Sequence, residues 1–288
     1  MSEGKKEILL GDCLELMKDI PNGSIDMILC DLPYGTTACK WDTIIPFDKL
    51  WGQYERIIKP NGAIVLTASQ PFTTDLINSK RNLFKYELIW NKISVSNPFS
   101  VKYSPLKCHE NIIIFCKTTP KYNAQVVEKP KNERRPIRKP HYGIDKTPKD
   151  GVYGNAKKGH GINFDDSIKH PKSIIEIPAV YAKHRIHPTE KSVALFEWLI
   201  KSYTDENDLV LDNTAGSGTT AIACLNTNRK FIVMEKEHKY YDIILKRVAD
   251  FNKNFEHESL IRSTSVALAG NVSGIAVRCG LNSTNFQK

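Results

Sequence analysis

Short apolar runs alternate with helix-period segments along most of the chain. Each run is rich in Ile, Leu and Val and is bounded by turn-forming residues, which is typical of buried strands. Alternation of such strands with amphipathic helices indicates strand–helix units. The sequence therefore predicts an α/β fold with a doubly wound, mostly parallel, Rossmann-like sheet. The predicted strands are Glu7–Leu10, Ile25–Cys30, Ala63–Thr67, Tyr86–Trp90, Asn111–Cys116, Leu209–Leu211 and Phe231–Met234.

Four segments have the spacing of helices that pack one apolar face on a sheet. They lie within 47–58, 189–200, 221–225 and 240–251. The turn Pro60-Asn61-Gly62 stops the first, and Thr189 is placed to cap the second. Residues 255–288 show no period, are rich in Ser, Asn, Gly and Ala, and are predicted to form a tail.

The composition excludes several classes of protein. Hydrophobic residues make up 41% of the 288 residues and charged residues 25%, which is ordinary for a globular domain. The absence of a long apolar run and of a signal-peptide layout predicts no membrane association and a cytoplasmic location. The seven cysteines are scattered without a CxxC spacing, and the eight histidines offer no metal-ligand set. We therefore expect neither disulfides nor a metal site.

One contiguous stretch, residues 117–185, carries the whole excess of positive charge. It holds 16 Lys and Arg against 7 Asp and Glu, whereas the rest of the chain is balanced. Two interpretations stay open, a solvated basic loop or linker and a surface that faces nucleic acid. The candidate DNA-binding residues are the densest basic positions, namely Arg134, Arg135, Arg138, Lys139, Lys157 and Lys158.

A glycine-rich turn follows one of the late strands. Asp212 is followed by Thr214, Gly216, Gly218 and Thr219 at the start of a predicted helix. Glycines at such a turn let the backbone approach a nucleotide closely, and helix N–H groups face the ligand. Glu235 ends the next strand 19 residues after Gly216, at a distance suited to a carboxylate that accepts both ribose hydroxyls. The pair predicts a nucleoside-cofactor site, although the glycines also fit a dinucleotide fingerprint.

A second group of chemical residues follows the strand Ile25–Cys30 directly. In an open parallel sheet this places it at the carboxyl edge, where ligands bind. A carboxylate and a backbone carbonyl there could accept the two hydrogens of an exocyclic amine, and an aromatic ring could stack on the heterocycle that carries it. The alternative is a plain strand-to-loop turn with an aromatic lid. The residues are Asp31, Leu32, Pro33 and Tyr34.

Three motifs in this order resemble those of S-adenosylmethionine-dependent amino-methyltransferases of DNA. They are Asp31–Tyr34, the segment His187-Pro188-Thr189-Glu190-Lys191, and Asp212–Thr220. The order is similar to that of the permuted beta subgroup, which acts on adenine N6 or cytosine N4. The resemblance covers roughly residues 7–250. It implies a methyltransferase domain in two parts, 1–116 and 186–254, with a target recognition region at 117–185 between them.

The resemblance also implies roles for individual residues. Asp12 and Cys13 are expected to meet the adenine of S-adenosylmethionine, although Asp12 could instead only cap a helix. Thr189 and Lys191 are expected near the methionine end, with Lys191 close to the cofactor carboxylate. Two departures from the family pattern stand out, Leu32 in place of Pro and Asn213-Thr214 in place of Pro-Phe. The first is tolerable because position 32 contributes a carbonyl, whereas the second removes an aromatic beside the cofactor.

The predicted function is methylation of adenine N6 in double-stranded DNA at a specific site. Related enzymes that act on cytosine more often have Ser at the position of Asp31, so the Asp favours adenine. Cytosine N4 is the second candidate. Two alternatives come from other classes, a DNA-binding module on an inactive methyltransferase scaffold and a nicotinamide-dependent oxidoreductase. Whether the protein forms a homodimer or has a partner restriction endonuclease stays open. We expect a bacterial cytoplasm, or a phage gene expressed in one.

Overall fold

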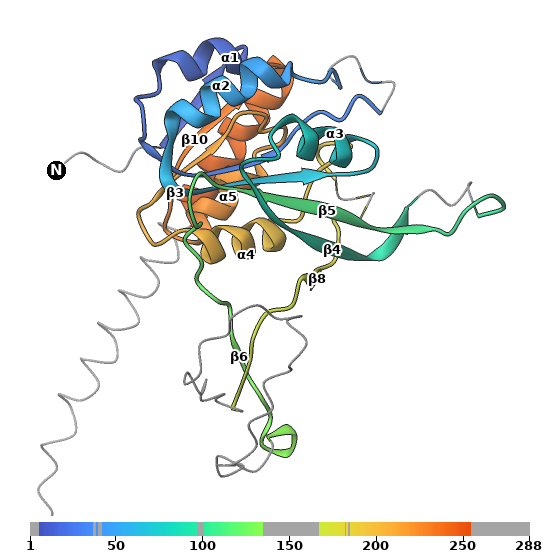
Figure 1. Cartoon of the computed structure of the whole chain (residues 1–288). Helices are drawn as coiled ribbons and strands as arrows, with labels where there is room; N and C mark the ends of the chain where they lie inside the picture. Colours follow the sequence, from blue (N-terminus) through green and yellow to red (C-terminus); the bar gives the residue numbers. More distant parts are fainter. Residues whose placement is uncertain are drawn as a thin grey trace, which may run out of the picture.

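The structure is a computed structural model that describes residues 6–36, 39, 42–96, 101–134, 167–181, 183 and 185–254. Its centre is an eight-stranded sheet in the order β1-β10-β9-β2-β3-β5-β4-β8 (Figure 1). The strands are β1 Lys6–Leu10, β2 Ile25–Asp31, β3 Ile58–Ala68, β4 Phe84–Ser96, β5 Lys107–Phe115, β8 Ile174–Glu176, β9 Leu209–Asp212 and β10 Lys230–Glu235.

The five strands from β1 to β3 in this order are mutually parallel, and β5 then runs antiparallel to both β3 and β4. The predicted mostly parallel α/β fold is confirmed. The first strand of the chain, β1, lies beside the last, β10, with Lys6 opposite Phe231 and Leu10 opposite Glu235. The two ends of the sequence therefore build one continuous sheet, as the predicted permutation requires.

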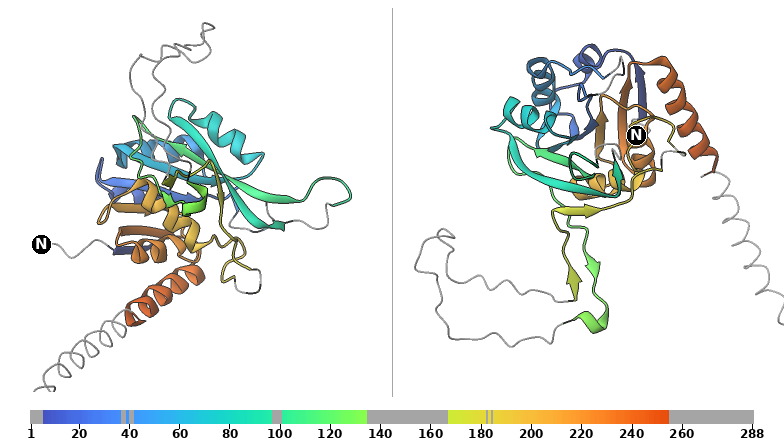
Figure 2. Two further views of the ribbon diagram at one scale, coloured as in Figure 1. Left: turned by 90° about the horizontal axis from the view of Figure 1, so that it is seen from below. Right: turned by 90° about the vertical axis from the view of Figure 1, so that its right-hand side faces the viewer.

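Helices cover both faces of this sheet (Figure 2). Alternate residues of β2 point to opposite sides, so that Met27 and Leu29 join one apolar cluster while Ile28 and Cys30 join the other. The first cluster packs on α4 Val193–Tyr203, α5 Thr219–Asn226 and a helix over 238–254. The second packs on α1 Cys13–Leu16, α2 Phe47–Ile57 and α3 Phe72–Ser79.

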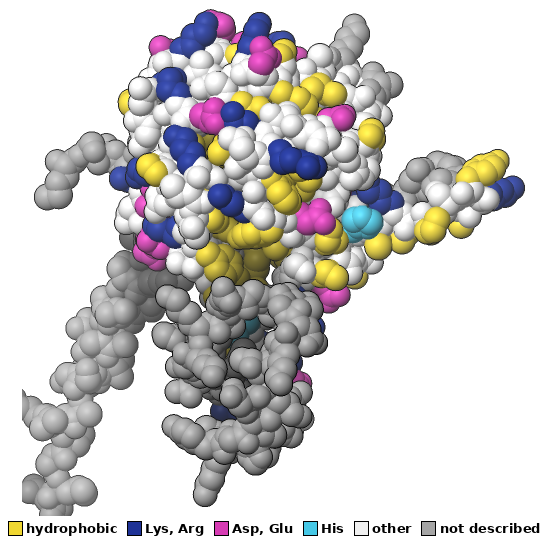
Figure 3. Space-filling model, in the orientation of Figure 1, with side chains coloured by type: hydrophobic (Ala, Val, Ile, Leu, Met, Phe, Trp, Pro, Cys, Tyr) yellow, Lys and Arg dark blue, Asp and Glu magenta, His cyan; other side chains and the backbone are white. Residues whose placement is uncertain are grey.

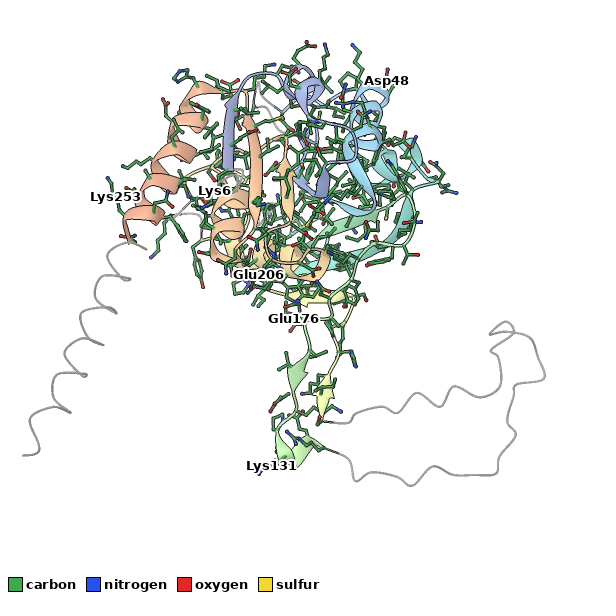
Figure 4. All side chains as sticks on the ribbon, turned by 90° about the vertical axis from the view of Figure 1, so that its left-hand side faces the viewer. Lys6, Asp48, Lys131, Glu176, Glu206 and Lys253 are labelled. Carbon is green, nitrogen blue, oxygen red and sulfur yellow. The ribbon has the colours of Figure 1, made fainter. Side chains whose placement is uncertain are left out.

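Two parts of the chain project from the helix-covered sheet. The first is a two-stranded ribbon of β6 Val127–Glu128 and β7 Ile168–Lys169, with Lys131 at its far tip (Figure 4). The strand β8, which pairs with β4, lies at its base. The second is the outer part of the β4–β5 pair, where exposed apolar side chains gather (Figure 3). These include Ile93, Val95, Val101 and Tyr103.

Two local predictions were wrong. Strand β3 follows α2 without a loop, because Ile58 already pairs with Ile25. Pro60, Asn61 and Gly62, which were predicted to form a turn that stops the helix, instead lie within β3, where the β2–β3 register shifts between Ile58 and Ala63. Helix α4 begins at Val193 and not after Thr189, because Glu190 N–H bonds to the His187 carbonyl at 3.0 Å and closes a separate turn. Thr189 is therefore not a helix cap.

Among the helices of the described residues, none has the length and apolar character needed to cross a membrane. Residues 255–288, predicted to be a tail, lie outside the described residues.

Candidate functional site

A cavity of about 600 Å³ opens at the carboxyl ends of the five parallel strands. Each strand delivers one polar side chain to its wall at or just after its last residue, as expected for the ligand-binding edge of an α/β sheet. Both ends of the sequence and its middle contribute, because the sheet order interleaves them. The residues are Asp12, Asp31, Ser69, Asp212 and Glu235.

The predicted catalytic residues Asp31, Leu32, Pro33 and Tyr34 line this cavity. The Tyr34 hydroxyl donates to Asp31 Oδ1 at 2.8 Å, and the hydroxyl of Thr67 donates to the same oxygen at 2.5 Å. These bonds orient the carboxylate at the end of β2.

The ring of Tyr34 stacks on Phe72, with ring centroids 5.0 Å apart. Burial, together with the Asp31 charge, raises the pKa of Tyr34 well above its ordinary value, so the phenol stays protonated. Its hydroxyl hydrogen is therefore available to Asp31 at neutral pH.

The glycine-rich turn has the backbone that only glycine adopts readily. Gly216 has φ +53° and Gly218 has φ +82°, both in the left-handed region. Gly218 precedes α5, and a Cβ atom there would lie 3.0 Å from the side chain of Ile244. A larger residue would therefore displace the helix over 238–254 or the turn itself.

Asp212 fastens the start of the same turn. Its Oδ1 accepts the Thr214 N–H at 3.0 Å, and its Oδ2 accepts the hydroxyl of Thr220. Burial raises the pKa of Asp212 to about 7, although these two hydrogen bonds favour the ionised form. The carboxyl thus changes charge close to neutral pH. Thr219, the first residue of α5, also lines the cavity.

Glu235 connects the turn to the end of β10. One carboxylate oxygen accepts the Gly216 N–H at 2.8 Å, and the other accepts the Glu237 N–H at 2.8 Å. Burial raises the pKa of Glu235 above its ordinary value. Each oxygen keeps a second lone pair that can face the cavity, so the carboxylate can still accept hydroxyl groups from a ligand.

Asp12 and Cys13 also line the cavity. The Asp12 side chain caps α1 by accepting the Leu14 N–H at 2.9 Å, so the capping role considered from the sequence is present. Burial raises the pKa of Cys13, which keeps the thiol neutral. Its sulfur lies 3.4 Å from the Asn213 side-chain nitrogen.

Asn213 and Thr214, which depart from the family pattern, are both bonded into the site. The side-chain oxygen of Asn213 accepts the Tyr54 hydroxyl at 2.5 Å and the Cys30 thiol at 2.9 Å. The Thr214 hydroxyl donates to the backbone carbonyl of Asp31 at 3.1 Å. These contacts join the glycine-rich turn to β2 and α2, so both residues that depart from the family pattern have polar partners in the site.

The segment that contains Thr189 and Lys191 forms part of the cavity wall. The Thr189 hydroxyl bonds to His187 Nδ1 at 3.0 Å. Lys191 is buried, and its Nζ lies 2.7 Å from Asp31 Oδ2 and 3.3 Å from Glu110 Oε2. Thr67 and Glu110 were not among the predicted site residues. A polar residue that ends the apolar run Ala63–Thr67 was a signal for the first, whereas no local pattern singles out Glu110.

The predicted DNA-binding residues are only partly described. Arg134 is exposed next to the short 3-10 helix at the tip of the ribbon, and its Nε donates to the Lys129 carbonyl at 2.9 Å. The other members of the set lie outside the described residues, namely Arg135, Arg138, Lys139, Lys157 and Lys158. Among the residues that the structure describes, no three His, Cys, Asp or Glu side chains gather as a metal site would require.

Comparison with known proteins identifies the relatives of this arrangement. A family described as DNA methylase matches residues 25–246. The chain is 28% identical to the type II methyltransferase M.BglII of Bacillus subtilis, over 89% of this chain and 73% of that protein. It is 27% identical to the DNA adenine methyltransferase YhdJ of Escherichia coli, over 89% and 87%. The solved structure of the PvuII DNA methyltransferase (cytosine-N4-specific) has a TM-score of 0.58 at 18% identity, and the match covers 85% of this chain and 89% of that one.

Proposed function

This chain belongs to the DNA methylase family, and we propose that it methylates adenine N6 in double-stranded DNA. The family match shows an S-adenosylmethionine-dependent DNA amino-methyltransferase, and the choice of adenine is our inference. The observation that carries it is Asp31, a carboxylate fixed by Tyr34 and Thr67 at the cavity wall. YhdJ, which is named an adenine methyltransferase, supports the same target.

The residues at the cavity wall suit a nucleoside cofactor. Glu235 presents a carboxylate for ribose hydroxyls beside Gly216, and Asp12 and Cys13 lie on the same wall. Gly216 lies on the cavity wall without a side chain, so its backbone is open to close approach, whereas Gly218 is not on the wall and leaves room for Ile244 behind the turn. When bound there, S-adenosylmethionine supplies a methyl group activated by a positively charged sulfur.

The residues at the cavity wall would make the target amine of adenine a better nucleophile. The lone pair of an adenine amine is delocalised into the ring, so the amine reacts poorly. Asp31 and the Leu32 carbonyl would accept its two hydrogens and localise that lone pair on nitrogen. Glu235 and the Gly216 turn would hold S-adenosylmethionine, which would supply the methyl group and keep the electron pair of the broken C–S bond, and the proton that the methylated amine releases would pass to water. Positive charge on nitrogen develops beside Asp31, which stabilises the transition state more than the ground state.

Residues 117–185 are proposed as the target recognition region between the two parts of the methyltransferase domain, 1–116 and 186–254. The ribbon carries Lys131 well away from the sheet (Figure 4), and Arg134 follows the short 3-10 helix that Lys131 begins. Both could reach DNA phosphates beside the target base. Flipping a base costs a few kcal/mol, and such contacts would offset that cost. Both curated relatives named above are bacterial, and one is a type II enzyme, which supports a bacterial restriction–modification setting.

Cytosine N4 is the second candidate, because the PvuII enzyme of similar fold is named cytosine-N4-specific. An inactive scaffold that only binds DNA is less well supported, since Asn213 and Thr214 are bonded into the site.

The substitution Asp31→Ala tests the proposal. It should abolish methyl transfer from tritiated S-adenosylmethionine to unmethylated plasmid DNA while cofactor binding, measured by calorimetry, changes little. Transfer at the wild-type rate in this variant would rule out the assigned role of Asp31.

A further inference from the structure

Lys191 lies at the centre of a buried chain of charges behind the catalytic carboxylate. Its Nζ lies 2.7 Å from Asp31 Oδ2 and 3.3 Å from Glu110 Oε2. The other oxygen of Glu110 faces Lys92 Nζ at 3.1 Å. The exposed fraction of the Lys191 side chain is 7%, and that of Glu110 is 15%. These four charged residues thus join β2, β4 and β5 to the segment that precedes α4.

Negative and positive side chains alternate in this set, so the pKa of each one depends on the charge of its neighbours. Burial alone would lower the pKa of Lys191, but Asp31 and Glu110 outweigh it and raise that pKa. Burial also opposes ionisation of Glu110, yet Lys191 and Lys92 hold its pKa below the ordinary value. Removing one member of such a set leaves an uncompensated charge in a poorly solvated place.

The hydrogen bonds that the Asp31 carboxylate already accepts show what this set of charged side chains does. A carboxylate has about four lone-pair sites. Tyr34 and Thr67 donate to Oδ1, and Lys191 donates to Oδ2. The three donors fix the plane of the carboxylate and leave one site on Oδ2 for an incoming amine.

We propose that Lys191 is a positioning residue that holds the Asp31 carboxylate aimed at the target amine, and that Glu110 is the counter-charge that keeps Lys191 there. This inference rests on the proposed methyl transfer. It differs from the expectation that Lys191 serves the cofactor carboxylate. Glu110 Oε2 is a buried oxygen without a well-aligned hydrogen bond in the described part of the chain. Moving Lys191 towards a ligand would take the nearest positive charge away from that oxygen, which is unfavourable.

The decisive variant is Lys191→Met, which keeps the length of the side chain and removes its charge. Without the ammonium group, Asp31 and Glu110 face each other as two carboxylates, and one of them takes up a proton at a higher pH. The single-turnover rate of methyl transfer to plasmid DNA should fall at least tenfold at pH 7. The acidic limb of its pH profile should move up by about one pH unit. The dissociation constant of S-adenosylmethionine, measured by calorimetry, should stay within threefold.

Two further variants separate charge from packing. The double variant Lys191→Met with Glu110→Gln removes the second carboxylate as well, and should return the acidic limb towards its wild-type position. Lys59→Met is the matched control, because Lys59 pairs with Asp26 of the same strand β2 at 2.6 Å, at the opposite end from the cavity. It should leave both the rate and the pH profile unchanged.

A measurement without catalysis keeps this test independent of the proposed function. The melting temperature of Lys191→Met should lie further below that of the wild type at pH 8 than at pH 5.5, because the repulsion between the two carboxylates weakens as the pH falls and one of them begins to take up a proton. If Lys191→Met does not fold, Glu110→Gln takes its place and should slow transfer without weakening cofactor binding. The inference is overturned if the cofactor dissociation constant rises tenfold while the acidic limb stays fixed, or if the loss of melting temperature is equal at both pH values. Absence of transfer by the wild type would instead refute the proposed function.

Discussion

The substitution Glu235→Gln tests the cofactor site at its best-defined contact. In the wild type, the two carboxylate oxygens accept the N–H groups of Gly216 and Glu237, each at 2.8 Å. A glutamine side chain has one accepting oxygen and one NH₂ group, which cannot accept. Whichever way the amide turns, one of these two N–H groups loses its partner, and one acceptor for a ribose hydroxyl disappears.

The magnitude follows from the kind of bond that is lost. A hydrogen bond to a charged group is worth about 1.5–3 kcal/mol, and each 1.4 kcal/mol corresponds to about tenfold in affinity. We therefore expect the dissociation constant of S-adenosylmethionine to rise about 10- to 100-fold. The expectation holds only if Glu235 faces the ribose while it anchors the Gly216 turn.

Isothermal titration calorimetry with purified protein gives the constant directly. Glu206→Gln is the matched control, since Glu206 is exposed and absent from the cavity wall (Figure 4), and it should bind the cofactor as the wild type does. A change of less than threefold in a folded Glu235→Gln variant would refute the assigned role of this carboxylate.

Two further predictions concern buried groups around the glycine-rich turn. Tyr54→Phe removes the hydroxyl that donates to Asn213 at 2.5 Å, and should lower the free energy of unfolding in urea by about 1 kcal/mol; equal stability would show that this bond contributes nothing. Burial raises the pKa of Asp212 from 3.8 to about 7, so between these pH values the folded protein holds a proton that the unfolded chain has lost, and the stability from this group falls as pH rises from 3.8 to about 7. Asp212→Asn should therefore flatten the fall in melting temperature between pH 5 and pH 7, and parallel curves would contradict this.

The fold was predictable because its signals are local. Apolar runs such as Ile25–Cys30 and Phe231–Met234 mark buried strands, and the order of motifs predicts that β1 pairs with β10. The positions of Asp31 and Glu235 followed from the same logic, since each ends a parallel strand.

Partners that are distant in sequence were not predictable. Lys191 contacts Asp31 across 160 positions, and its second partner Glu110 lies on a strand whose pattern gives no sign of a charge facing the cavity. The start of α4 was misplaced because Thr189 has the residue type of a cap, while its hydroxyl is engaged by His187. Such choices depend on tertiary contacts that a local pattern does not contain.

The identity of the modified nucleoside shows directly which base the protein methylates. The full chain and its Asp31→Ala variant would be expressed in a bacterial host without DNA methylation of its own. The DNA would then be digested to nucleosides for mass spectrometry. We predict N6-methyladenine with the wild type and none with the variant. Detection of N4-methylcytosine would instead identify cytosine N4, the second candidate, as the target. Detection of neither nucleoside, although the protein is folded and binds the cofactor, would contradict the proposed methyl transfer.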